Sequence, residues 1–186
     1  METIVVKFKM LDKRAIVPTY AHDGDVCMDF TAISCEYDEE NDMYVYHTGW
    51  AVESDFGLGQ FIFPRSSNRR TDCYLTNSVG VVDSAIYRGE ICFCYKNRDS
   101  LETKATLHAL VNCVRWGASA SFVDEHVKQI KKRFIEDAHK LLFAPYKVGD
   151  RIGQFVFLQY PKIEIETTDT LSSSDRGEGG FGSTGN

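Results

Sequence analysis

An acid, an aromatic ring and several turn-forming residues stand close together in the stretch 77–91. The Asp83 carboxylate and the Tyr87 hydroxyl are both groups that can take part in chemistry. We interpret this stretch as a β-hairpin with Asp83 and Tyr87 near its bend. At this point an ordinary core role for Tyr87 remains the alternative.

Two further segments carry groups that suit a phosphate or another oxyanion. Arg65, Ser66 and Ser67 follow an apolar run that ends in a proline, and they offer a guanidinium, two hydroxyls and backbone donors. The stretch 149–156 reads as a tight turn leading into a buried strand, with the Gln154 amide as a donor. Taken singly, either segment is equally compatible with a surface loop or scaffold.

The last eleven residues, 176–186, have the composition of a mobile strap that closes over a phosphorylated ligand. Five glycines let the backbone approach oxyanions closely. Arg176 offers a planar fork of donors, Ser183 and Thr184 add hydroxyls, and Phe181 is an aromatic ring able to cover something flat. The alternative is a disordered glycine-rich terminus.

Asp29 is an acid between apolar neighbours at the start of an expected strand. It serves either as a turn or capping acid, or as an outer-sphere holder of water around a metal bound to phosphate. The sequence alone leaves both roles open.

Composition restricts the class of protein. The chain has 186 residues, of which 43% are hydrophobic, so we expect one domain over 1–175 followed by the strap 176–186. A net charge of −6 argues against a nucleic-acid coat or a membrane-surface role. Six cysteines without a C-x-x-C pair and five histidines without metal-ligand spacing receive no role. Without a leader or a spanning segment, we expect a cytoplasmic protein, or a nuclear one in a eukaryotic cell.

Short strands separated by Gly, Asp, Asn and Pro predict a mainly β fold, an all-β sandwich or jelly roll. The expected strands are 4–8, 29–35, 44–46, 60–63, 90–95, 151–158 and 162–166. Within 98–146 a capping-box pattern begins at Ser121, and apolar residues then recur every three or four positions to Leu141. This pattern predicts one amphipathic α-helix, whose charged face is either solvated or a contact for a partner chain.

Together and in this order, these segments resemble the trimeric deoxyuridine triphosphate diphosphatase family, the dUTPases. The resemblance runs from about residue 13 to the end of the chain, apart from one insertion at about 98–146. Five family motifs have counterparts, namely Asp29 in its segment, Pro64-Arg65-Ser66, Gly80-Val81-Val82-Asp83 with Tyr87-Arg88-Gly89, Gly149-Asp150-Arg151-Ile152 with Gln154, and the strap from Arg176 to Gly185.

The resemblance implies hydrolysis of dUTP to dUMP and pyrophosphate by Mg²⁺-assisted in-line attack of water on the α-phosphorus. Such an enzyme limits uracil in DNA and supplies dUMP for dTMP synthesis. It implies Asp83 as general base and Asp29 as the holder of Mg²⁺ through water. It also implies a dUTPase-like jelly roll or distorted β-barrel, and a homotrimer whose active sites are shared between subunits.

The resemblance assigns the remaining site residues to parts of the nucleotide. Arg65, Ser66 and Gln154 would hold the α and β phosphates, and the strap would close on the γ end and cover uracil with Phe181. Asn77 and nearby main-chain groups would read the uracil edge, and Tyr87 would pack on deoxyribose. The implied substrate-binding residues are Arg65, Ser66, Ser67, Asn77, Gly80, Val82, Tyr87, Gln154, Arg176, Gly180, Phe181, Gly182, Ser183 and Thr184.

The chain departs from the family pattern in ways that keep other functions open. Three residues separate Asp83 from Tyr87 where the family has two, and we expect a bulge or a wider turn to absorb the extra one. The insertion leaves a nucleotide-dependent regulatory or interaction module as an alternative. A related dCTP deaminase is a third possibility. That family needs a glutamate at the position of Cys94, and its absence argues against deamination.

Overall fold

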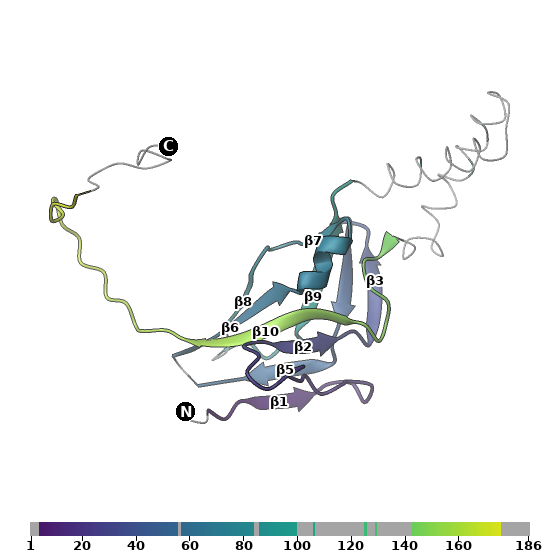
Figure 1. Cartoon of the computed structure of the whole chain (residues 1–186), viewed down its shortest axis with the longest axis horizontal. Helices are drawn as coiled ribbons and strands as arrows, with labels where there is room; N and C mark the ends of the chain where they lie inside the picture. Colours follow the sequence, from purple (N-terminus) through teal and green to yellow (C-terminus); the bar gives the residue numbers. More distant parts are fainter. Residues whose placement is uncertain are drawn as a thin grey trace.

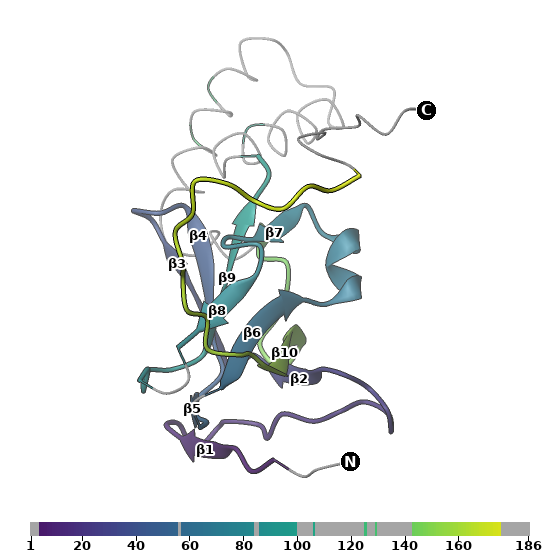
Figure 2. The same cartoon turned by 90° about the vertical axis from the view of Figure 1, so that its left-hand side faces the viewer.

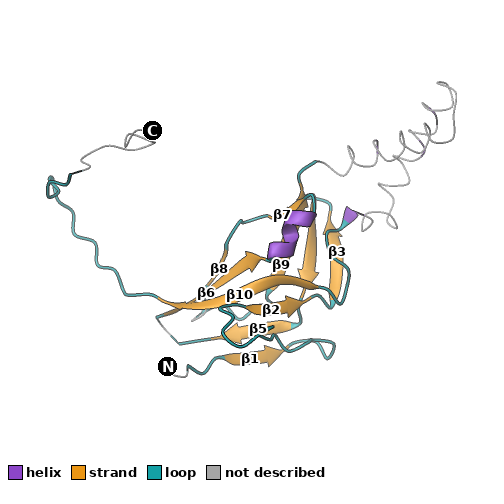
Figure 3. Ribbon diagram, viewed as in Figure 1, coloured by secondary structure: helices purple, strands orange, loops and turns teal. Residues whose placement is uncertain are grey.

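The computed structural model describes residues 4–55, 57–83, 86–99, 106, 125, 129 and 143–175. Most of the regular structure in these residues is β-strand. A short 3₁₀ helix, η1 (Ser66–Arg70), follows strand β6 (Leu58–Pro64) (Figure 3). The predicted mainly β architecture is confirmed. The segment in which we predicted the amphipathic helix lies largely outside the described residues.

The described strands form three open sheets. One four-stranded sheet has the order β2-β10-β6-β8, and the other has the order β3-β4-β9-β7. The pair β1-β5 lies along one end of the domain (Figure 2). The bounds are β1 Lys7–Met10, β2 Met28–Thr31, β3 Ser34–Asp38, β4 Met43–His47, β5 Trp50–Glu53, β6 Leu58–Pro64, η1 Ser66–Arg70, β7 Cys73–Leu75, β8 Gly80–Val82, β9 Cys92–Asn97 and β10 Arg151–Gln159.

Alternating burial along the strands builds the core. In β4 and β9 every second residue is buried, and these positions are Asn97 and the aromatic residues Tyr44, Tyr46, Phe93 and Tyr95. Their rings pack with Phe30 and Phe155 between the two large sheets. The buried Tyr95 hydroxyl donates to the Ile152 carbonyl at 2.6 Å, so a polar group within the core is satisfied.

Three sequence predictions about strands need correction. The range 29–35 contains two strands, β2 and β3, separated at Ala32 and Ile33, because β2 pairs with β10 whereas β3 pairs with β4. The stretch 77–91 is not a two-stranded hairpin. Its β8 pairs with β6, and β9 pairs with β4 and β7, so the stretch connects the two large sheets.

The predicted strand 162–166 is wrong. These residues are exposed and lie in an extended segment that leaves the domain after β10 (Figure 1). Ile163 and Ile165 are 72% and 89% exposed, and the described part of the chain offers them no neighbouring strand. A β-branched pattern makes a strand only where another strand supplies hydrogen-bond partners.

Candidate functional site

Asp29 joins two arginines at the edge of the β2-β10-β6-β8 sheet, Arg65 directly after β6 and Arg151 at the start of β10. Its Oδ1 accepts a hydrogen bond from Arg65 Nε at 2.8 Å, and its Oδ2 accepts one from an Arg151 guanidinium nitrogen at 3.0 Å. The Asp29 side chain is only 5% exposed, whereas that of Arg151 is 51% exposed. The carboxylate therefore fixes both guanidiniums while Arg151 still reaches solvent.

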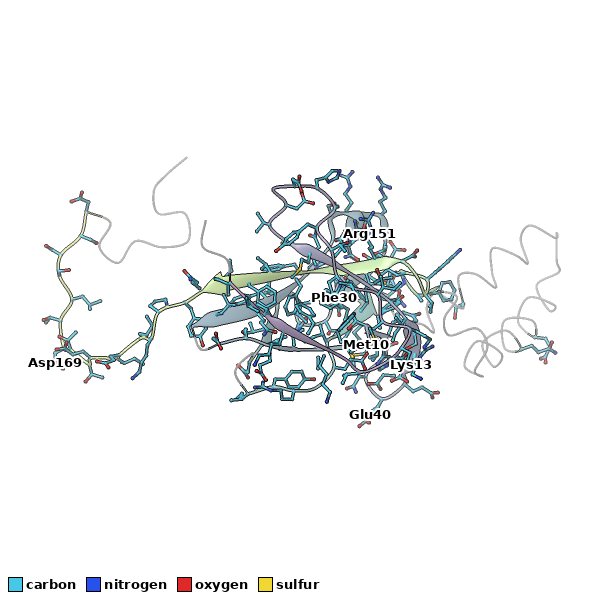
Figure 4. The ribbon with its side chains drawn as sticks, turned by 90° about the horizontal axis from the view of Figure 1, so that it is seen from below. Met10, Lys13, Phe30, Glu40, Arg151 and Asp169 are labelled. Atoms are coloured by element: carbon cyan, nitrogen blue, oxygen red, sulfur yellow. The ribbon has the colours of Figure 1, made fainter. Side chains whose placement is uncertain are left out.

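The sheet register brings Gln154 to the same place. Gln154 lies opposite Asp29 on β2 and opposite Phe63 on β6. The preceding Gly153 lies opposite Pro64, directly before Arg65, and a Cβ at Gly153 would overlap the Phe93 ring. Figure 4 shows Phe30, the neighbour of Asp29, among the packed side chains and Arg151 toward the edge of the domain. The first, second and fourth motifs thus converge on one surface.

A turn of 3₁₀ helix presents the hydroxyls of the second motif. Ser66 is exposed and Ser67 is half-buried at the start of η1. Asn68 anchors the turn, because its side-chain amide donates to the Cys73 carbonyl and its Oδ1 accepts from the Tyr146 hydroxyl at 3.1 Å. Burial raises the pKa of Tyr146, so this phenol stays a neutral donor. Arg65 and Ser66 are therefore held on a braced turn.

The third motif surrounds a cavity of about 270 Å³ on the other side of β6. Gly80 is required there, because a Cβ at this position would lie 2.6 Å from Ile62 and 2.9 Å from the Asn77 amide nitrogen. The lining includes four predicted site residues together with Asp83, which is exposed. Those four are Asn77, Gly80, Val82 and Tyr87.

A tight backbone turn accommodates the extra residue between Asp83 and Tyr87. The Asp83 carbonyl accepts hydrogen bonds from the amides of Ile86 at 3.0 Å and Tyr87 at 2.7 Å. The Tyr87 ring then lies against Gly89, where a Cβ would overlap it, and its hydroxyl donates to the Glu90 carbonyl at 3.0 Å. Tyr87 remains 43% exposed, so its ring faces the cavity and is not a core tyrosine.

The predicted site residues around Asp83 and those around Asp29 do not lie together within one chain. Val82 pairs with Gln60 near the beginning of β6, whereas Arg65 follows Pro64 at its end. At about 3.3 Å per residue, the five steps from Gln60 to Arg65 span about 16 Å. Asp83 and the Asp29, Arg65 and Gln154 cluster therefore belong to two separate half-sites in a single chain.

The geometry around Asp29 limits how this acid can serve a metal ion. Both of its oxygens accept hydrogen bonds from guanidiniums, so neither is presented as a bare ligand. A carboxylate oxygen has a second lone pair and can still accept a hydrogen bond from a bound water. The residues therefore fit a magnesium ion held mainly by the substrate and approached by Asp29 through water.

The strap lies outside the described residues, and this includes the predicted site residues Arg176, Gly180, Phe181, Gly182, Ser183 and Thr184. Sequence reasoning did not assign a site role to Arg151, although it stands in the fourth motif. Only the strand register reveals that it shares Asp29 with Arg65. In the described chain, no helix is long and apolar enough to cross a membrane.

Comparison with known proteins gives a uniform result. A family model described as dUTPase matches residues 144–185. A deoxyuridine 5′-triphosphate nucleotidohydrolase from Streptomyces avermitilis is 31% identical over 182 residues, which cover 97% of this chain and 80% of that protein.

Solved structures share the fold. A variant of the Staphylococcus bacteriophage 80alpha dUTPase, solved with dUpNHpp, superposes with a TM-score of 0.63 at 20% identity and covers 98% of this chain and 99% of its own. A variant of the dUTPase from phage phi11 of S. aureus, described with a structural Mg(II) ion, has a TM-score of 0.56 at 20% identity. It covers 90% of this chain and 98% of its own.

Proposed function

The chain belongs to the dUTPase family and is an enzyme that hydrolyses dUTP, and we propose that it does so through water attack on the α-phosphorus with Asp83 as general base. The products are then dUMP and pyrophosphate. The observation that carries this assignment is the position of Asp83 at the mouth of a cavity that also holds Asn77 and Tyr87. The Asn77 amide can bind the edge of a nucleobase and the Tyr87 ring can pack on a sugar, so the acid beside them is placed for nucleotide chemistry.

Asp83 suits the role of base because it is exposed and its backbone is fixed. Two amide hydrogen bonds to its carbonyl hold the turn, while the carboxylate remains free to meet water. A general base needs this combination, since the proton it accepts must lie within hydrogen-bond reach. The carboxylate receives the water proton as the water oxygen attacks the α-phosphorus and pyrophosphate leaves.

The phosphates are assigned to the half-site around Arg65. Arg65 is oriented by Asp29, so its remaining guanidinium donors are fixed in direction for the α and β phosphates. Ser66 supplies an exposed hydroxyl and Gln154 adds an amide to this surface, whereas the Oγ of Ser67, also assigned to substrate binding, is buried. Charge-assisted hydrogen bonds of this kind stabilise charge as it develops on the phosphate oxygens.

Mg²⁺ is the proposed cofactor, carried mainly by the triphosphate. When bound, it neutralises phosphate charge and favours an in-line geometry. Asp29 contributes by accepting a hydrogen bond from a water of the ion and by holding Arg65 and Arg151 in place. The acid thus has a positioning role in addition to the predicted metal role.

The lining of the cavity supports a steric basis for substrate choice. Gly80 lets the Asn77 amide approach the cavity wall closely, and this wall is where we place the edge of uracil. Uracil and thymine share the same hydrogen-bonding edge, so a tight wall must exclude the thymine methyl group. Tyr87 packs on deoxyribose and leaves no room for a 2′-hydroxyl, which selects dUTP over UTP.

We propose that each complete active site forms between subunits of a homotrimer. The half-sites of Asp83 and Arg65 are about 16 Å apart along β6, so one triphosphate cannot satisfy both within one chain. The extended segment 160–175, whose residues are exposed, gives the strap the reach to close over a site formed by neighbouring chains. The strap residues Arg176, Ser183 and Thr184 then hold the γ-phosphate, and Phe181 covers uracil.

A nucleotide panel tests this function. The purified full chain is assayed with dUTP, dCTP, dTTP and UTP, and the products are identified by chromatography. We expect dUMP and pyrophosphate from dUTP, and much slower turnover of the other three. Conversion of dCTP to dUTP would identify a deaminase, and binding of dUTP without product would leave only a nucleotide-dependent interaction module.

A further inference from the structure

Three side chains of different ligand type meet on one face of the sheet β3-β4-β9-β7. His47 on β4 lies directly opposite Cys92 on β9, and the His47 Nδ1 and the Cys92 Sγ are 3.6 Å apart. Glu90, two residues before Cys92, brings its Oε2 to 2.9 Å from the same Nδ1. The three donor atoms all lie within 4.8 Å of one another. This combination of nitrogen, sulfur and oxygen is a ligand set that zinc-type ions accept.

The carboxylate of this group is held in place by the backbone. Glu90 Oε1 accepts a hydrogen bond from the Gly49 amide at 2.7 Å, which leaves Oε2 directed at His47. Gly49 has a φ of +75°, and a Cβ there would lie 2.8 Å from the Cβ of Ala15, so only glycine suits this approach. A ligand whose second oxygen is anchored by a hydrogen bond is preorganised.

The separations agree with the edges of a tetrahedral site. Bond lengths of about 2.0 Å from zinc to nitrogen and about 2.3 Å to sulfur give a nitrogen–sulfur edge of about 3.5 Å. The observed separation between the His47 and Cys92 atoms is 3.6 Å. The separation of 2.9 Å between His47 and Glu90 is that of a hydrogen bond, and it needs to open by only a few tenths of an ångström.

The surroundings favour a cation and give it access. Glu36 on β3 places its Oε1 3.6 Å from His47 Nε2, so a shift of a few tenths of an ångström lets it accept a hydrogen bond from Nε2–H when Nδ1 is a ligand. His47 and Glu90 are 28% and 26% exposed. Both line a cavity of about 320 Å³, which leaves room for a water as fourth ligand. Two carboxylates and one imidazole make this group net negative, which attracts a divalent ion.

We propose that His47, Glu90 and Cys92 form a binding site for a divalent transition ion of the zinc type, with water as the fourth ligand. The ion is bound through His47 Nδ1, Glu90 Oε2 and Cys92 Sγ. Binding releases the thiol proton to solvent and places the imidazole proton on Nε2, toward Glu36. The site does not include Asp29, and it adjoins the nucleotide pocket, because Glu90 and Cys92 also line the cavity beside Asp83.

Cobalt(II) is the probe, because a thiolate ligand produces a charge-transfer absorption and a tetrahedral site produces intense visible bands. Full-length protein, freed of metal by a chelator, is titrated with Co²⁺ in the absence of nucleotide, so that no phosphate supplies ligands. We expect both features to saturate at one ion per chain. Wild-type protein that shows neither feature would overturn the proposal.

Two variants separate this site from other thiols. Cys92→Ser should abolish the charge-transfer band, whereas Cys94→Ser, two residues along the same strand, should retain it. Glu90→Gln replaces a proposed ligand by a neutral amide and should weaken cobalt binding by at least the roughly tenfold that loss of an outer-shell partner costs. Thermal melting without metal shows whether each variant is folded. A band that survives Cys92→Ser in folded protein, or disappears in Cys94→Ser, would contradict the assignment.

Zinc itself is tested by protection of the thiol. Metal-free and zinc-loaded wild-type protein are treated with iodoacetamide, and modification of Cys92 and Cys94 is measured by mass spectrometry. Zinc should slow alkylation of Cys92 at least tenfold relative to Cys94 in the same sample. Equal slowing at both cysteines would indicate general protection by folding and would count against a site at Cys92.

Discussion

Asp83 and Arg65 lie toward opposite ends of the same strand, β6. Asp83 follows Val82, which pairs with Gln60, while Arg65 directly follows the last residue of β6. Asp83 must activate a water beside the same phosphorus whose oxygens Arg65 holds, and a separation of about 16 Å is too large for this within one chain. This separation, rather than any feature of the family, is the structural reason to expect shared active sites.

Mixed oligomers test this separation. Asp83→Asn and Arg65→Gln are each expected to be nearly inactive alone. After the two variants are unfolded, mixed in equal amounts and refolded together, random assortment should place an intact Asp83 opposite an intact Arg65 at about one quarter of the sites. We therefore expect about a quarter of wild-type dUTP turnover. A mixture no more active than its components would show that each chain builds its own site.

Replacing the proposed base should separate chemistry from binding. Asp83→Asn keeps the shape of the side chain but removes its ability to accept the water proton. We expect kcat to fall by about 10²- to 10⁴-fold, while a non-hydrolysable dUTP analogue still binds with similar affinity. Pyrophosphate release and calorimetric titration measure the two quantities. Undiminished pyrophosphate release would remove Asp83 from the base role.

The Asp29 ion pairs should contribute to stability without any metal. Asp29→Asn removes the charge that faces Arg65 and Arg151 and leaves Arg65, whose side chain is 23% exposed, without its carboxylate partner. We expect a loss of about 3 kcal/mol, the low end for a broken buried pair, because both guanidiniums keep contact with water. Thermal melting in chelator should show this loss. A loss seen only with Mg²⁺ present would assign Asp29 a metal role alone.

The contact between Tyr87 and Gly89 should control sugar selection. A Cβ at Gly89 would overlap the Tyr87 ring, so Gly89→Ala must displace the ring from its place beside the cavity. We expect the ratio of kcat/KM for dUTP over UTP to fall roughly tenfold. Tyr87→Phe is the matched control, since it keeps the ring and should keep most of the discrimination. Equal losses in the two variants would argue against steric selection by the ring.

Buried tyrosines should make the protein sensitive to alkaline pH. Burial raises the pKa of Tyr44 to about 12 and raises those of Tyr46 and Tyr95 further above their usual value of 10.0. Above about pH 10 the unfolded chain therefore binds fewer protons than the folded one. The free energy of unfolding should be unaffected by these groups below that pH and should decrease as the pH rises through the folded-state values.

Urea unfolding at several values from about pH 8 to about pH 11 measures this decrease. Tyr95→Phe should make the decline shallower. It should also lower stability at neutral pH by about 1 to 3 kcal/mol, because the buried Ile152 carbonyl loses its donor. A decline of unchanged steepness in Tyr95→Phe would show that other groups cause the alkaline sensitivity.

Local chemistry in the sequence determined several features of this protein. Residue type and order predicted that Asp83 lies on a bend, which the hydrogen bonds to its carbonyl confirm. The assignment of Arg65 and Ser66 as oxyanion donors, and of the glycine-rich strap as a separate segment, stays a prediction. The β-branched and aromatic runs predicted most strands, because alternating burial leaves a period of two in the sequence. Cys92 and Cys94, two residues apart on β9, lie on one strand face, as this period requires.

Only the tertiary structure decided which of these groups meet. Strand pairing joined β8 to β6 and so separated Asp83 from Arg65, and it also placed Arg151 beside Asp29 and His47 beside Cys92. Histidine spacing along the chain gave no metal signal, since His47 and Cys92 are far apart in sequence and adjacent only across two strands. Pairing between distant strands depends on the packing of the whole core, and a local pattern does not encode it.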